Sequence, residues 1–188
     1  MRKIIFLIIS LLITSCENMN DSQPSKIVFL GDSITQQAED FEDGFISLIR
    51  QNLSEDKFEL IGKGISGNKV SDLLTRYKSD VLDLNPDLVF IYIGINDVWH
   101  KYDFGTGSDI DLYEKGLRAI ISDIKSLGSK IVLCTPTVIG ENTGDFELGN
   151  QFKDVETMEK MNGDLDTFSD VVRKLSNEYE TELLDLRK

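Results

Sequence analysis

The sequence predicts an α/β fold built on one parallel sheet, with helices packed against its faces. Short apolar runs alternate along the chain with segments whose apolar residues recur at helical spacing. Such alternation is typical of βαβ units with right-handed crossovers. The chain has 188 residues, and 40% of them are hydrophobic, which suits a single domain with a well-developed core.

The first strand is predicted at Ile27–Leu30, an unbroken apolar run of the kind found in fully buried parallel strands. It ends abruptly at Gly31 and Asp32, which places Ser33 at the carboxyl end of the strand. Ligands bind at this end of the strands in open α/β sheets. Ser33 is therefore either the N-cap of a following helix or a nucleophile, and local preference alone favours the cap.

The next elements follow from apolar spacing and from turn residues. A helix is predicted near Gly44–Asn52, followed by a second strand at Lys57–Ile61 and a flexible turn over residues 62–68. An apolar stripe predicts a helix over Val70–Val81. Pro86 lies beyond it and cannot continue a helix.

The third strand is predicted at Leu88–Ile93, the most strand-like run in the chain, and a polar loop is predicted over His100–Gly107. Ser108, with Asp111 three residues later, resembles a capping box that opens the next helix. Gly128 is the kind of residue that follows the end of a helix.

The fourth strand is predicted at Lys130–Cys134, and an acidic, irregular segment follows with one short helix around Phe152–Met161. A last helix, Leu165–Tyr179, leads into a fifth strand at Thr181–Leu186. A doubly wound sheet normally carries a further helix over that side. The sequence provides no residues for it, so the expected fold lacks its C-terminal helix.

The N-terminal segment is predicted to direct export. Residues 1–15 combine a positive start with the apolar run Ile4–Ile13, and small residues then precede Cys16. This pattern resembles a bacterial lipobox, which predicts a lipid-modified Cys16, a tether over residues 16–25 and a domain over residues 26–188. The protein would then be an exported lipoprotein, attached to a membrane by its lipid alone, in the periplasm or at the cell surface. The alternative is a plain secretory signal followed by a chance cysteine.

The net charge argues against polyanionic partners. The formal charge of the chain is −13, and removal of Arg2 and Lys3 with the signal takes it to −15. Such an acidic surface disfavours nucleic acid but not neutral sugars or uncharged esters.

Three residues that can support acyl transfer follow the first three strands: Ser33, Gly67 and Asn96. With strand order 2-1-3-4-5 their loops meet where the order reverses. A serine hydroxyl there can attack a carbonyl. The N–H groups of Ser33 and Gly67 and the Asn96 amide can stabilise the resulting oxyanion.

The motifs GDSIT, GISGN and GIND, which carry these three residues, resemble the first three blocks of the SGNH (GDSL-type) hydrolases in order and spacing. The resemblance implies a flavodoxin-like three-layer α/β/α sandwich and a serine esterase without metal or organic cofactor. It assigns Ser33 as the nucleophile and Gly67 and Asn96 as the oxyanion hole. Short-chain or acetyl esters, including those on carbohydrate, are the expected substrates, with a thioesterase or lysophospholipase as alternatives.

One block of the family pattern is absent. The family's base is a histidine, oriented by an aspartate three residues earlier, after the fifth strand, and this sequence contains no such pair there. His100, the only histidine, stands three residues after Asp97, but it follows the strand that delivers Asn96, on the opposite side from the usual base. It is not assigned as the base. A non-catalytic protein that binds esters or glycans therefore stays open as an alternative.

Overall fold

The computed structural model describes residues 23–139 and 155–187. The predicted signal peptide and Cys16 lie outside the described residues, and so do most of the tether and the segment after Ile139. No helix within the described ranges is long and apolar enough to cross a membrane.

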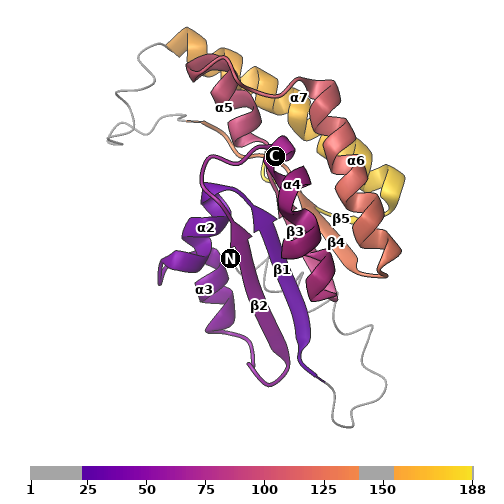
Figure 1. Cartoon of the computed structure of the whole chain (residues 1–188). Coiled ribbons are helices and arrows are strands. Elements are labelled where there is room, and N and C mark those ends of the chain that lie inside the picture. The colour runs from indigo at the N-terminus through magenta and orange to yellow at the C-terminus, as the bar shows by residue number, and fades with distance from the viewer. Residues whose placement is uncertain (1–22, 140–154, 188) are drawn as a thin grey trace.

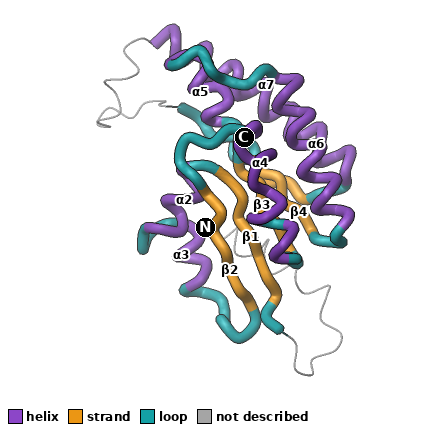
Figure 2. The backbone as a smooth tube through the Cα atoms, in the orientation of Figure 1, coloured by secondary structure: helices purple, strands orange, loops and turns teal. Residues whose placement is uncertain are grey.

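Five parallel strands form one sheet in the order β2-β1-β3-β4-β5, as predicted (Figure 2). The strands are β1 (Ser25–Gly31), β2 (Phe58–Gly64), β3 (Leu88–Tyr92), β4 (Lys130–Cys134) and β5 (Glu182–Leu184). Gly31 at the end of β1 pairs with Gly64 of β2 and with Tyr92 of β3. The carboxyl ends of these three strands are therefore level, and their loops leave the sheet side by side.

Helices flank the sheet in two layers (Figure 1). One layer consists of α2 (Ser33–Asp40) and α3 (Phe45–Arg50), which pack beside β1 and β2. The other consists of α4 (Val70–Asp80), α5 (Ile95–Asp103), α6 (Ile110–Ser126) and α7 (Val155–Tyr179), with the short 3-10 helix Leu82–Leu84 after α4. The three-layer α/β/α sandwich is confirmed.

The central strand explains why the chain needs two layers. Val28 and Leu30 point into one hydrophobic core, and Ile27 and Phe29 point into the other. All four side chains are at most 2% exposed. The unbroken apolar run is therefore required because β1 is buried on both faces.

Three predictions about the second half of the chain are wrong. His100 lies in the helix α5 and not in a polar loop. Asp109, not Ser108, is the N-cap of α6. In place of two helices, the single helix α7 runs for 25 residues through Asn162 and Gly163.

An apolar cavity of about 300 Å³ lies beside α2 and α3, on the same face of the sheet. Its lining includes Phe29, Phe45, Phe90, Tyr92 and Leu184. Phe29 and Phe90 stack with their ring centroids 4.8 Å apart. On this face the apolar side chains of β3, β4 and β5 thus border the cavity, and residues of α2 and α3 line its other sides.

Candidate active site

The serine turn is held by the residue before the serine. Asp32 is the N-cap of α2, and its Oδ1 accepts a hydrogen bond from Ile34 N at 3.0 Å. Asp32 therefore ties this turn, and the prediction of Ser33 as the cap is wrong. Ser33 is instead the first residue of the helix and is partly exposed. Its hydroxyl is therefore not needed for capping, and it sits where the helix dipole favours negative charge.

Two glycines allow α2 to start this close to the sheet. A Cβ on Gly31 would lie 2.1 Å from Thr35 Oγ1, and a Cβ on Gly64 would lie 2.1 Å from Gln36 N. Either contact is far shorter than atoms tolerate, so a side chain at either position would push α2 away. The short turn between β1 and α2 depends on both glycines.

Gly67 and Asn96 meet beside this turn. Gly67 has a φ of +77°, which turns the loop between β2 and α4 back on itself. Asn96, in the first turn of α5, is 3% exposed, and its Nδ2 donates to the carbonyl of Asn68 at 3.0 Å. In the same loop Ile65 N donates to Gly31 O at 3.3 Å and Ser66 N to Gln36 Oε1 at 2.8 Å. The structure thus brings the three predicted site loops together.

Asp97 fixes the spacing of these loops. Its buried carboxylate accepts from Val70 N, the first residue of α4, at 3.1 and 3.2 Å, and from the Ser108 side chain. Burial raises the pKa of Asp97 to about 6, although these hydrogen bonds and Lys69 oppose the rise. Burial also raises the pKa of Asp32 to about 7, and the negative charge of Asp97 adds to that rise.

Arg76 joins three segments of the site, although no motif of the sequence points to it. Its guanidinium donates to the carbonyls of Gly31 at 2.8 Å and Lys63 at 3.1 Å, and to Asn68 Oδ1 at 2.8 Å. It also pairs with Asp80, one turn later in α4. The sequence shows only that an arginine stands between the apolar positions of α4. Its partners, from other elements, could not be identified from local spacing.

His100 lies beside Gly67. Its Cε1 is 4.0 Å from the position that a Cβ on Gly67 would occupy, and its ring meets Phe104 edge to face. Burial, followed by the charge of Lys69, lowers the pKa of His100. His100 and Asn96 both lie in α5, so this helix forms the side of the site next to Gly67.

The described residues contain no cluster of three or more His, Cys, Asp or Glu side chains that could hold a metal ion. None of Ser33, Gly67 and Asn96 lines the cavity over β3 to β5, although Ile34 and Thr35 do. The site is therefore a set of loops at the edge of the sheet, next to that cavity and distinct from it.

Replacement of Asp97 by Asn tests the cost of its buried charge. Because its pKa of about 6 lies above the ordinary 3.8, the folded protein binds more protons than the unfolded chain between these values. Stability is therefore lost as pH rises through this window. Asn keeps an acceptor for Val70 N and cannot ionise. When urea unfolding is measured at about pH 4.5 and at about pH 7, the fall in the free energy of unfolding between the two should be smaller for Asp97→Asn than for the parent protein. An equal or larger fall in Asp97→Asn would show that the buried Asp97 carboxylate does not cause this pH dependence.

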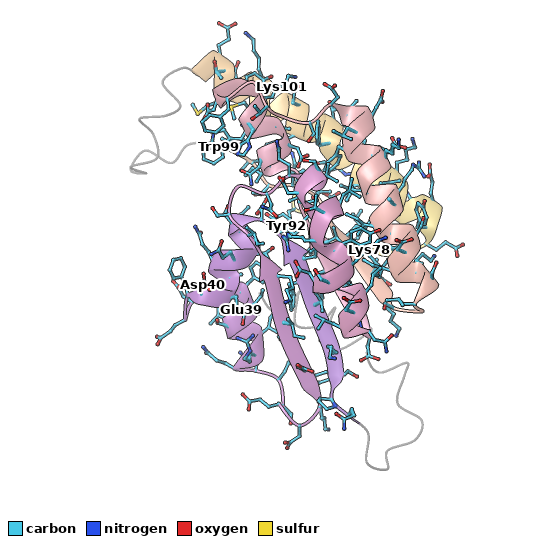
Figure 3. The ribbon with its side chains drawn as sticks, viewed as in Figure 1. Glu39, Asp40, Lys78, Tyr92, Trp99 and Lys101 are labelled. Atoms are coloured by element: carbon cyan, nitrogen blue, oxygen red, sulfur yellow. The ribbon has the colours of Figure 1, made fainter. Side chains whose placement is uncertain are left out.

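Replacement of Arg76 by Lys tests whether the hydrogen bonds of its guanidinium hold the site loops together. An ammonium group keeps the charge but cannot reproduce the planar, multidentate arrangement of donors. We expect unfolding to become easier by about 2 kcal/mol, from lost hydrogen bonds to a charged group. Amide hydrogen exchange over residues 64–69 should become faster. Lys78→Ala, at an exposed position on the same helix, is the matched control (Figure 3). Unchanged exchange in Arg76→Lys would show that the loop does not depend on this side chain.

Comparison with known proteins agrees with the geometry. The model of the GDSL-like Lipase/Acylhydrolase family matches residues 29–188. An acetylxylan esterase of Geobacillus stearothermophilus is 36% identical over 138 residues, which are 64% of this chain and 63% of that protein. The match thus spans less than two thirds of that relative's length.

Solved structures are similar over more of the chain. The crystal structure of the acetyl xylan esterase AlAXEase has a TM-score of 0.74 and 40% identity, covering 86% of this chain and 77% of that one. The structure of Axe2, an acetylxylan esterase from Geobacillus stearothermophilus, has a TM-score of 0.69 and 29% identity, covering 89% and 78%. Together with the family model, these likenesses show that the chain belongs to the GDSL-like lipase/acylhydrolase family.

Proposed function

We propose that this protein is a carbohydrate esterase that removes acetyl groups from xylan or xylo-oligosaccharides. The observation that carries the proposal is the meeting of Ser33, Gly67 and Asn96 at one edge of the sheet. The substrate class is supported by the relatives described above, which are acetylxylan esterases. An acidic surface is compatible with xylose units, which carry no charge.

The geometry supports a two-step reaction through an acetyl-enzyme. Ser33 Oγ forms a bond to the acetyl carbon, and the bond from that carbon to the sugar oxygen then breaks. The proton of the Ser33 hydroxyl passes to this oxygen, so that the sugar leaves with a free hydroxyl group. Water next attacks the acetyl-serine, which releases acetate and restores the hydroxyl. Each step passes through an oxyanion that requires donors already in place.

Asn96 can serve as such a donor because its amide has two hydrogens. One donates to the carbonyl of Asn68, which fixes the orientation of the amide. The other has no hydrogen-bond partner among residues 23–139 and 155–187 and can donate to the oxyanion. The N–H groups of Gly67 and Ser33 are the further donors. Loss of one donor of this kind costs about 3–4 kcal/mol of transition-state stabilisation.

The base decides between an enzyme and a binding protein. His100, the only histidine of the sequence, lies against Gly67 on α5 and not on the β5 side of the site. A serine without a base is a poor nucleophile. We therefore expect the 188-residue chain to release acetate slowly, and a non-catalytic glycan-binding protein is the second candidate.

The experiment measures acetate release from acetylated xylo-oligosaccharides with and without added imidazole, which can act as an external base. Imidazole should raise the Ser33-dependent rate by at least about tenfold, since a positioned base contributes more than that. Ser33→Ala should abolish the enzymatic rate, and His100→Ala should retain the response to imidazole. Absence of Ser33-dependent release under all conditions, together with no labelling of Ser33 by a fluorophosphonate, would favour the binding protein.

We propose further that Cys16 carries the membrane anchor. The support is the sequence alone: a positive start, a short apolar run and small residues before the cysteine. Cells expressing the parent gene should incorporate radioactive palmitate into this protein and hold it in the membrane fraction. Cys16→Ser should abolish both. Incorporation that persists in Cys16→Ser would overturn the proposal.

A further inference from the structure

Several of the well-exposed apolar side chains follow the strands of the sheet at their carboxyl ends. Among the described residues seven large hydrophobic side chains are well exposed, and four of them come after the carboxyl ends of strands β2 to β5, one of these only after the helix α5. These four are Ile65, Phe104, Val138 and Leu186. Phe104 is the most exposed, at 66%. Since the chain is otherwise strongly acidic, an apolar rim here points to a ligand that is neither charged nor fully polar.

Phe104 belongs to a wall that begins at the oxyanion loop. His100 Cε1 lies 4.0 Å from the Cβ position of Gly67, and the rings of His100 and Phe104 meet with centroids 5.2 Å apart at 81°. We call His100 and Phe104 together the aromatic wall. It extends from Gly67 outward to solvent.

Backbone contacts hold this wall in place. The N–H groups of Phe104 and Thr106 both donate to the carbonyl of His100, at 3.1 and 2.9 Å. Lys69 Nζ donates to the carbonyl of Thr106 at 2.7 Å. Because Lys69 follows Gly67 by two residues, the segment that carries Phe104 is tied to the oxyanion loop itself. The backbone that carries the exposed ring is thus anchored both to α5 and to Lys69.

The chemistry of the wall matches a sugar ring. A pyranose has apolar C–H faces, which pack on an aromatic ring, and a rim of hydroxyl groups, which need hydrogen-bond partners. Phe104 offers an apolar ring, and the lowered pKa of His100 favours its neutral form, in which one nitrogen donates and the other accepts. An acetyl group has only two carbons and fits at the oxyanion hole without so extended a wall.

We propose that the aromatic wall binds a xylosyl unit of the substrate next to the unit that carries the acetyl ester. This inference rests on the proposed function and adds to it the position of the sugar chain. The chain leaves the site across Gly67 and His100 toward Phe104. The wall thereby selects oligosaccharides over small acetyl esters.

The test measures binding of unacetylated xylotetraose by isothermal titration calorimetry, which needs no catalytic base. Phe104→Ala should weaken binding about tenfold, equivalent to about 1.4 kcal/mol. Phe104→Trp keeps an aromatic face and should bind within about twofold of the parent, since ring stacking is retained. Phe41→Ala is the matched control, because the Phe41 side chain is also well exposed, at 55%. Phe41 follows Asp40 at the end of α2, and Figure 3 shows Asp40 well apart from Trp99, which lies on the same helix as His100. The control variant should bind as the parent does.

Equal affinity of the parent protein and Phe104→Ala overturns the proposal and leaves the esterase function intact. The same holds if Phe104→Ala alters the preference between acetate and butyrate esters but not sugar binding, because the ring would then contact the acyl group. If the parent does not bind xylotetraose, the wall is refuted. Ser33-dependent release of acetate from small esters then shows whether the esterase survives without xylan as its substrate.

Discussion

The geometry of the site depends on one buried carboxylate. Asp97 follows Asn96 directly, and it accepts the N–H of Val70, three residues after Gly67. Two of the predicted oxyanion donors, Gly67 and Asn96, follow different strands, and this contact sets the distance between their loops. A carboxylate in so little water is costly, as its raised pKa shows. The fold accepts this cost at the point where the loops have to be fixed.

Arg76 fixes the position of the loop after β2 relative to the end of β1. It holds the end of β1 through Gly31 O and the loop after β2 through Asn68 Oδ1. Asn68 in turn accepts from the Asn96 amide through its carbonyl. A continuous chain of hydrogen bonds therefore runs from the strand before Ser33 to Asn96. This network holds the proposed oxyanion donors in place before any substrate arrives.

The sequence predicted the sheet and the placement of the three site residues because these depend on local signals. Uniformly apolar runs mark strands buried on both faces, and parallel strands end at a common edge. The level register of Gly31 and Gly64 then brings the loops together. The identity of the helix cap was not predictable, since Asp32 and Ser33 are equally good caps by preference.

Features that depend on distant partners were missed. Asn162 and Gly163 suggest a break in a helix, yet α7 continues through both. Buried Asn162 accepts from Ile139 N at 3.0 Å and donates to Ile139 O at 3.0 Å. Tertiary hydrogen bonds outweigh the helix preference here. Ser108 likewise resembles a cap in sequence, but its side chain bonds to Asp97 of another element, which local spacing cannot predict.

The level edge of the sheet also bears on how such a protein can change. Ile65, Phe104, Val138 and Leu186 lie in four separate segments, and all four are well exposed. Substitutions at exposed positions usually alter folding stability little. A combinatorial library at these positions can therefore explore new surfaces around one unaltered core. The division of the chain into a rigid sheet and an exposed rim makes the fold readily evolvable.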